Sequence, residues 1–113
     1  MHEFSLIQPL LEHIETVAEQ NKLEHITKVI LQIGVFRQCL PEILEFAFTT
    51  LTAGTKAEGA QLVIELLPIQ MECLSCRKIF TLDKHIFICP NCGQTQLQLL
   101  SGKEFILKTI EGE

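Results

Sequence analysis

Hydrophobic residues recur at helical spacing near the start of the chain. The apolar stripe consists of Leu6, Ile7, Leu10, Leu11, Ile14, Val17 and Ala18, whereas Glu12, Glu15 and Glu19 fall outside it. Ser5 followed by Gln8 resembles a capping box, which would place Pro9 in the first turn, where its missing N–H does little harm. The pattern predicts an amphipathic helix over residues 5–21.

A second helical pattern begins at Pro41, a residue that suits the first position of a helix. The positions expected to face the core are Ile43, Leu44, Ala47, Phe48 and Leu51. Gly54 follows them and is a candidate for the C-terminal cap.

Three other segments alternate between apolar and polar residues, as half-buried strands do. The first covers residues 25–35, with Thr27, Val29, Leu31, Ile33 and Val35 on one face. The second covers residues 60–67, with Leu62, Ile64 and Leu66 on one face, and Pro68 closes it. The third covers residues 104–110, after a turn at Ser101 and Gly102.

Three strands with two helices on one face predict an α+β fold of two layers. The last strand is expected to return and pair with the earlier strands, because connections in sheets usually join neighbouring elements. Residues 69–100 would then be an inserted, zinc-ribbon-like lobe. We therefore expect one domain from residues 1–68 together with 101–113, and a second domain from residues 69–100.

The inserted lobe contains two Cys-x-x-Cys pairs. Cys73 and Cys76 form the first, Cys89 and Cys92 form the second, and twelve residues connect them, enough for a short hairpin. Two residues between ligands let one turn aim both sulfurs at a single ion, and Gly93 can take the positive φ that such a turn often needs. Four thiolates from two turns are typical of a tetrahedral structural zinc site.

A rubredoxin-like iron site and a pair of disulfides are the alternatives to zinc. Disulfides are disfavoured because no secretory signal precedes the cysteines and nothing else indicates an oxidising compartment. The lobe is too short for an ordinary core, so a bound metal would supply its folding free energy. Four thiolates can also bind iron, so the rubredoxin-like site stays open beside the preferred zinc site.

Composition narrows the class of protein. The chain has 113 residues, is 47% hydrophobic and carries a formal net charge of -5. No apolar run approaches the roughly 18 residues that a membrane helix needs, so we expect a small cytoplasmic protein without membrane attachment. A nucleic-acid partner is disfavoured because only Arg77, Lys78 and Lys84 cluster near the cysteines, where they can offset an anionic zinc site.

The amino terminus offers a second set of metal ligands. The amine of Met1, the imidazole of His2 and the backbone amides of His2 and Glu3 can surround one ion with nearly planar nitrogen donors. Planar nitrogen geometry suits Ni(II) and Cu(II) rather than Zn(II).

Together these features resemble the HypA/HybF family of hydrogenase maturation factors. The matching residues are Met1-His2-Glu3 with Ser5, Ile33-Gly34, Pro41-Glu42, Phe46-Ala47-Phe48, Gly54-Thr55, Glu58-Gly59-Ala60, the two cysteine pairs with Cys89-Pro90-Asn91-Cys92-Gly93, Gly102 and Ile110-Glu111. The chain departs from the commoner family pattern at Phe36-Arg37-Gln38-Cys39, where small and polar residues are more usual.

The resemblance implies a nickel metallochaperone. It implies nickel bound at the amino terminus through His2, and structural zinc at Cys73, Cys76, Cys89 and Cys92. It also implies partnership with the GTPase HypB and delivery of nickel to the large subunit of a [NiFe]-hydrogenase, or in some organisms a role with urease accessory proteins. Whether the chain is a monomer or a homodimer stays open.

Two other function classes are alternatives to this one. A zinc-ribbon module that binds protein or nucleic acid would need the cysteines but would be indifferent to His2. An enzyme is disfavoured because no nucleophile elbow, phosphate loop or HExxH pattern occurs. The remaining candidates are expected to be structural: Cys39 as a small buried residue, and His13, His25 and His85 as exposed surface.

Overall fold

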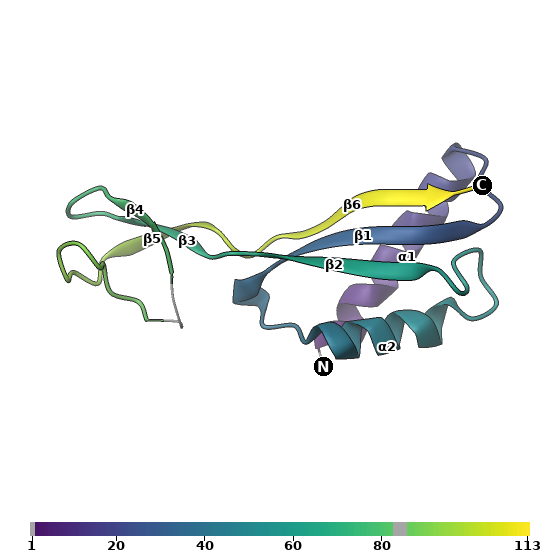
Figure 1. The fold of residues 1–113 in the computed structure, drawn as a ribbon, viewed down its shortest axis with the longest axis horizontal. Helices are drawn as coiled ribbons and strands as arrows, with labels where there is room; N and C mark the ends of the chain where they lie inside the picture. The colour runs from purple at the N-terminus through teal and green to yellow at the C-terminus, as the bar shows by residue number, and fades with distance from the viewer. Residues whose placement is uncertain (1, 83–85) are drawn as a thin grey trace. The chain divides into compact units, whose positions relative to one another are not determined.

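The computed structural model describes residues 2–82 and 86–113, with side chains in the first helix from Ser5 onward. Its elements are α1 (His2–Gln20), β1 (Ile26–Gly34), the 3₁₀ helix η1 (Val35–Arg37), α2 (Pro41–Thr52), β2 (Gln61–Leu67), β3 (Gln70–Cys73), β4 (Ile79–Thr81), β5 (Leu97–Ser101) and β6 (Phe105–Gly112), as Figure 1 shows. Neither helix in this described part of the chain combines the length and hydrophobicity that crossing a bilayer requires.

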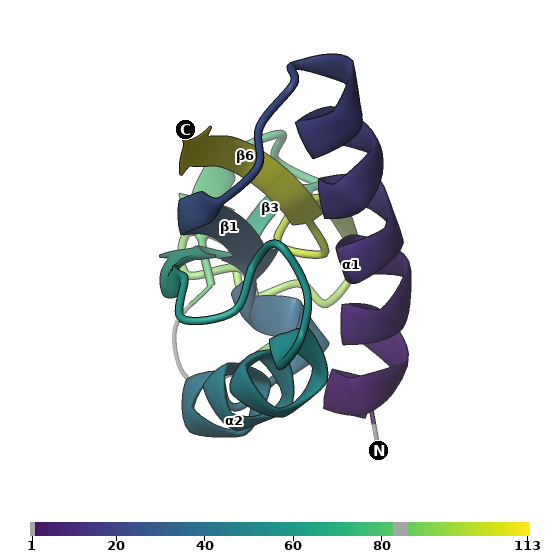
Figure 2. The same ribbon diagram turned by 90° about the vertical axis from the view of Figure 1, so that its right-hand side faces the viewer.

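The first sheet has the strand order β2-β1-β6. The last strand therefore returns to pair with the first, as the sequence predicts. Both helices lie over one face of this sheet (Figure 2), which confirms the α+β fold. On the sheet, the Gln32 amide donates to the Glu65 carboxylate at 3.1 Å, and the Lys108 ammonium donates to the same oxygen at 3.2 Å. These contacts link side chains from all three strands.

Helix α1 begins three residues earlier than the sequence pattern predicts. Its bounds are His2–Gln20, so Ser5 lies inside the helix and the expected capping box is wrong. Pro9 consequently occupies the helix interior, where it is exposed and cannot donate to a carbonyl four residues earlier. The apolar stripe is correct, because Ile7, Leu10 and Ile14 are buried.

Helix α2 begins at Pro41, as predicted, and ends at Thr52. Gly54 follows one residue after the cap position with φ +81°, the left-handed conformation that favours glycine. The Thr52 hydroxyl, buried in the core, donates to the Phe48 carbonyl at 2.7 Å. Leu44, Ala47 and Phe48 are fully buried, so this helix supplies a large part of the core that supports the first sheet.

The second sheet has the order β4-β3-β5, with β3 antiparallel to both neighbours. Glu72 lies opposite Ile79, and Cys73 lies opposite Leu97. In its described part, the segment between the cysteine pairs supplies one strand, β4, whose partner is β3. Cys73 therefore stands at the end of a strand that is paired on both sides.

The chain divides into two compact units. The first comprises Met1–Gln32, Cys39–Glu65 and Ile106–Glu113, and the second comprises Ile33–Gln38 and Leu66–Phe105. Val35 and Leu66, which the alternation assigns to the core face of strands, are both exposed. Val35 lies in η1, which the sequence pattern does not predict. The expected domain division into residues 1–68 with 101–113 and residues 69–100 stays a prediction about independent folding.

Candidate metal centre

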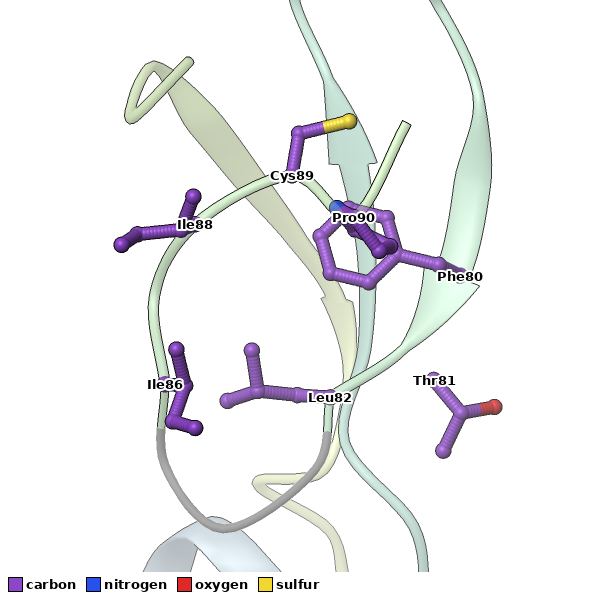
Figure 3. A pocket seen from close by; sticks show the side chains of 7 residues that line it. All are labelled: Phe80, Thr81, Leu82, Ile86, Ile88, Cys89 and Pro90. Carbon is purple, nitrogen blue, oxygen red and sulfur yellow. The ribbon is translucent and has the colours of Figure 1, made fainter. Parts of the chain in front are cut away.

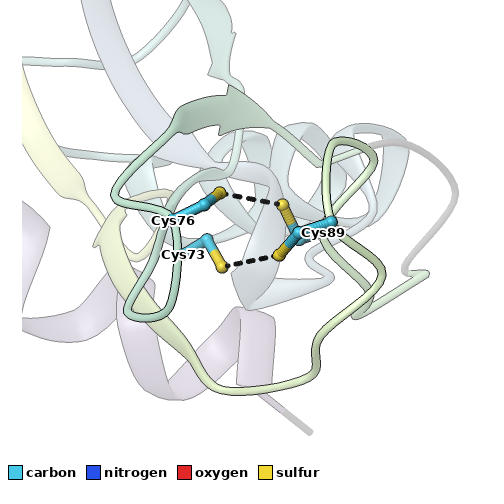
Figure 4. Close-up of side chains that lie close together, drawn as sticks. Cys73, Cys76 and Cys89 are labelled. Carbon is cyan, nitrogen blue, oxygen red and sulfur yellow. Dashed lines mark hydrogen bonds between the residues drawn. The ribbon is translucent and has the colours of Figure 1, made fainter.

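The four cysteines of the two Cys-x-x-Cys pairs converge on one point. Their sulfur atoms all lie within 4.8 Å of one another. Cys73 Sγ lies 3.5 Å from Cys92 Sγ, and Cys76 Sγ lies 3.7 Å from Cys89 Sγ (Figure 4). A zinc ion with Zn–S bonds of about 2.3 Å in tetrahedral geometry needs sulfurs about 3.8 Å apart. The cluster therefore fits a structural zinc site.

The two cysteine turns share one backbone geometry. The Arg77 N–H donates to the Cys73 carbonyl at 2.7 Å, and the Gly93 N–H donates to the Cys89 carbonyl at 2.9 Å. Both donors have positive φ, +65° for Arg77 and +76° for Gly93. The sequence predicts this conformation for Gly93 and misses it for Arg77, because an arginine gives no signal of a left-handed residue.

Each turn is closed by a second backbone bond. The Cys73 N–H donates to the Lys78 carbonyl, and the Cys89 N–H donates to the Gln94 carbonyl, both at 2.9 Å. Two equivalent turns thus face each other across the four sulfurs. Of the residues between the paired cysteines, Asn91 adds a side-chain contact, because its amide donates to Cys76 Sγ at 3.5 Å.

Backbone and amide N–H groups stabilise thiolates in this cluster. The Asn91 side-chain amide and then the Lys78 backbone N–H lower the pKa of Cys76 to about 6. The Cys76 backbone N–H and then, more weakly, that of Ser75 lower the pKa of Cys73. Because a metal binds the thiolate, these donors favour the metal-binding form of both side chains.

The pKa of Cys92 is shifted upward, opposite to those of Cys73 and Cys76. The Gln94 backbone N–H lowers the pKa of Cys92, but desolvation and the neighbouring thiols of Cys73 and Cys89 outweigh it and raise the pKa to about 12. Four adjacent thiolates without a cation repel one another. A divalent ion supplies the charge that allows all four to be deprotonated together.

The cluster is buried on one side only. Cys73 and Cys89 are buried, whereas Cys76 and Cys92 are exposed. The Asn91 backbone N–H donates a hydrogen bond to Cys89 Sγ at 3.4 Å. Among the residues that the structure describes, no other group of three or more histidine, cysteine or acidic side chains could hold a metal. Cys39 lies outside the four-cysteine cluster and is half-buried, whereas the sequence predicts a small buried residue.

A family sequence model described as "Hydrogenase/urease nickel incorporation, metallochaperone, hypA" matches residues 1–112. The chain belongs to the HypA family. The "Hydrogenase maturation factor HypA" of Aquifex aeolicus is 40% identical over 113 residues, which cover 100% of this chain and 98% of that relative. The protein of the same name from Moorella thermoacetica is 38% identical over 113 residues, covering 100% of both chains.

Solved HypA structures share the fold. A "Solution structure of HypA protein" aligns with a TM-score of 0.74 at 24% identity, covering 100% of this chain and 97% of that one. The "Solution structure of the Ni metallochaperone HypA from Helicobacter pylori" aligns with a TM-score of 0.68 at 22% identity, covering 97% of this chain and 96% of that one. HypA is a metallochaperone and maturation factor rather than an enzyme, in agreement with the sequence analysis.

The histidines expected to lie outside any metal site are exposed where they are described. His13 is exposed on α1, and His25 is exposed just before β1, as the sequence predicts. His85 lies outside the described residues.

The HypA amino terminus is described only in part. His2 and Glu3 belong to the first turn of α1, although their side chains and Met1 lie outside the described residues. The first four backbone N–H groups of any helix have no acceptor within the helix. The amides of His2 and Glu3 are therefore not needed for helical hydrogen bonds.

Proposed function

We propose that this chain is a nickel metallochaperone that binds Ni(II) at its amino terminus and delivers it for maturation of a [NiFe]-hydrogenase. The match to a family described by nickel incorporation supports the metal and the role. The position of His2 and Glu3 in the first turn of α1 supports the site, because two proposed amide ligands stand where a helix leaves N–H groups uncommitted.

The proposed ligands are the amine of Met1, the amide nitrogens of His2 and Glu3, and the imidazole of His2. Two deprotonated amides carry two negative charges, and the amine and imidazole are neutral when they bind. Ni(II) in this set forms an uncharged complex. Such a complex avoids the repulsion that a bare cation would meet at the positive end of a helix dipole.

Zinc at Cys73, Cys76, Cys89 and Cys92 would supply folding free energy to the lobe rather than take part in nickel transfer. Residues 69–100 would then form a zinc-dependent domain, attached to a nickel-binding domain of residues 1–68 and 101–113. In this division, His2 and the four cysteines act on different metals and can be tested separately.

Nickel would move by ligand exchange with a partner, without bond chemistry in the chain itself. The partners we propose are a HypB-type GTPase, the large subunit of a [NiFe]-hydrogenase and, where urease is present, its accessory proteins, all in the cytoplasm. A site at the first residues of a helix suits this exchange, because an incoming donor can reach the ion without opening the core.

A nickel titration tests the assignment. His2→Ala should abolish stoichiometric nickel binding, while zinc content and thermal unfolding stay close to those of the wild type, since a terminal side chain carries little of the core. His13→Ala is the matched control, because His13 is exposed on the same helix, and it should bind nickel normally. Nickel binding by His2→Ala at wild-type stoichiometry and affinity would contradict the proposal. A wild-type chain that holds zinc but no nickel would instead indicate a zinc-ribbon interaction module.

A further inference from the structure

The two cysteine turns are supported differently by the fold. Cys73 ends β3, which is hydrogen-bonded to β4 on one side and to β5 on the other. Cys89 follows residues 86–88, which belong to no helix or strand. After the second turn, the Leu74 N–H donates to the Gln96 carbonyl at 2.9 Å, and β5 then begins. The second turn is therefore tied to the sheet on its C-terminal side.

The inner side of residues 86–88 faces a cavity rather than a filled core. A pocket of about 290 Å³ is lined by Ile86, Ile88 and Pro90, with Phe80 and Leu82 contributing from β4 and the residue after it (Figure 3). Ile86 and Ile88 remain 55% and 48% exposed. Close packing on the pocket side therefore does not hold residues 86–88, the segment that leads into Cys89, in place.

The residue between these two isoleucines has a partner of its own. Phe87 does not line the pocket. Its ring meets the ring of Phe36 edge to face, with the centroids 6.5 Å apart and an angle of 79° between the planes. This is a favourable geometry for an aromatic pair. Phe36 comes from η1, which is far from Phe87 in the sequence.

Phe36 is in turn held by the strand connection around residue 102. Its backbone N–H donates to the Gly102 carbonyl at 2.9 Å, and the Lys103 ammonium lies 5.4 Å from the centroid of its ring. The next residue, Arg37, donates from Nε to the Lys103 carbonyl at 2.8 Å and lies over the Phe105 ring at 5.8 Å. Four contacts therefore fix the segment that presents Phe36.

We propose that Phe36 and Phe87 are positioning residues for the zinc centre. The ring of Phe36, which the contacts above hold in place, packs against the ring of Phe87. This contact fixes residues 86–88, which lead into Cys89, so that the second cysteine turn faces the first. Phe36 belongs to the segment Phe36-Arg37-Gln38-Cys39, where the chain departs from the commoner family pattern. The inference rests on zinc occupancy of the four cysteines and not on nickel delivery.

Zinc release to an excess of a colorimetric chelator tests the proposal. Phe87→Ala and Phe36→Ala should each lose zinc about two- to tenfold faster than the wild type, the range that corresponds to one aromatic pair. The double variant should be no faster than the single ones, because the two changes remove the same contact. Phe87→Tyr keeps the ring and should restore the wild-type rate. Phe46→Ala is the matched control, because Phe46 is 65% exposed on α2.

A spectroscopic measurement covers the case in which an alanine variant is poorly folded. The chain contains no Trp and no Tyr, so Phe36→Trp creates a single fluorophore beside Phe87. The tryptophan fluorescence of the Phe36→Trp variant should change when zinc is removed by chelation and return to its starting value when zinc is restored. The tryptophan fluorescence of the Phe46→Trp variant should not change.

Wild-type release rates in both ring-deletion variants, additive effects in the double variant, or unchanged Phe36→Trp emission would overturn the proposal. A wild-type chain that contains no zinc would overturn the zinc assignment as well. The two failures are therefore distinguishable.

Discussion

Gly34 and Gly102 meet backbone to backbone at the end of β1. A methyl group placed on Gly34 would lie 1.9 Å from the Gly102 carbonyl oxygen, far inside van der Waals contact. The Gly34 N–H also donates to the Glu104 carbonyl at 2.8 Å. The chain after β1 is thus pressed against the connection between β5 and β6 at a distance that only glycine allows.

Gly34→Ala should be strongly destabilising for steric reasons alone. Gly34 has φ -71°, which alanine adopts readily, so the cost arises from the clash with a backbone carbonyl. Thermal or urea unfolding should show that the free energy of unfolding falls by an amount near the upper end of about 1–3 kcal/mol. Gly59→Ala is the contrast: no atom lies within 4 Å of its added methyl, but φ is +77°, and the expected loss is about 1 kcal/mol. Equal losses in the two variants would contradict this account.

Arg77→Gly should leave the zinc site intact. Arg77 has φ +65°, so glycine relieves a left-handed conformation that costs about 1 kcal/mol in other residues. The ion pair that is lost, with Glu72 at 3.8 Å, is exposed on the arginine side and worth little. Zinc content should be unchanged and thermal unfolding equal to the wild type or slightly higher. Gly93→Arg, the reciprocal change in the second turn, should be destabilising; a loss of zinc in Arg77→Gly would contradict the prediction.

The features that can be predicted from the sequence are those that depend on the spacing of residues close together in the chain. Helical spacing around Leu44 and Phe48 reflects burial of one face, which the structure shows directly. The alternation in residues 25–35 is confirmed for Val29, Leu31 and Ile33, which are buried, and is wrong for Thr27 and Val35, which are exposed. Cysteine spacing predicted the cluster because each pair lies within one turn. The sequence pattern misplaces the start of α1 because Ser5 and Gln8 imitate a cap, while His2 and Glu3 carry no signal against a helix.

The features that could not be predicted depend on contacts between distant residues or on unusual backbone angles. The pairing of Phe36 with Phe87 requires η1 and the approach to the second cysteine turn to meet, and exposed phenylalanines have no periodicity that would indicate it. Arg77 adopts its conformation because its N–H closes the turn at Cys73. The closed turn outweighs the local preference of arginine.

Cys92→Ser should remove nearly all bound zinc and unfold residues 69–100, because the lobe has little core without the metal. The first sheet and its helices, which bury their own core around Phe48, should retain helical circular dichroism. Cys39→Ser is the matched control, since Cys39 lies outside the four-sulfur cluster, and its zinc content should equal that of the wild type. A full complement of zinc in Cys92→Ser would refute the four-cysteine assignment.

Glu65 should stabilise the first sheet in a pH-dependent way. Hydrogen bonds from Gln32 and then Lys108 lower the pKa of its carboxyl group. A carboxyl group whose pKa is lower in the folded state stabilises the fold above its unfolded pKa, about 4.3, and loses this contribution as the pH falls through the folded value. The difference in melting temperature between the wild type and Glu65→Gln should therefore be larger at pH 7 than at pH 3. When Lys108→Met is present in both proteins, the difference in melting temperature between the chain with Glu65 and its Glu65→Gln variant should depend less on pH. A difference that stays constant between pH 3 and pH 7 in the wild-type background would contradict the prediction.

Nickel affinity should rise steeply between about pH 6 and 8. Terminal amines ordinarily have a pKa of about 7.7–8.0 and histidine rings one of about 6.5, and both must lose a proton before they bind a metal. In the proposed site, amide ligation by His2 and Glu3 would release further protons. Isothermal titration in buffers of different ionisation enthalpy would count the protons released, and the proposed set requires more than a single histidine could supply.

A short extension placed before Met1 separates this ligand set from its alternatives. The extension converts the amine into a peptide nitrogen and moves the chain end away from His2, so it breaks the planar set without changing any side chain. The extended protein should still fold and hold zinc, because the four cysteines and the core residues of α1 from Ile7 onward are untouched. Removing the extension with a protease that leaves Met1 as the first residue should restore binding. If the extended chain binds nickel with unchanged stoichiometry, affinity and pH dependence, the amine is not a ligand, and His2 must instead act with donors such as His13 or the Glu3 carboxylate.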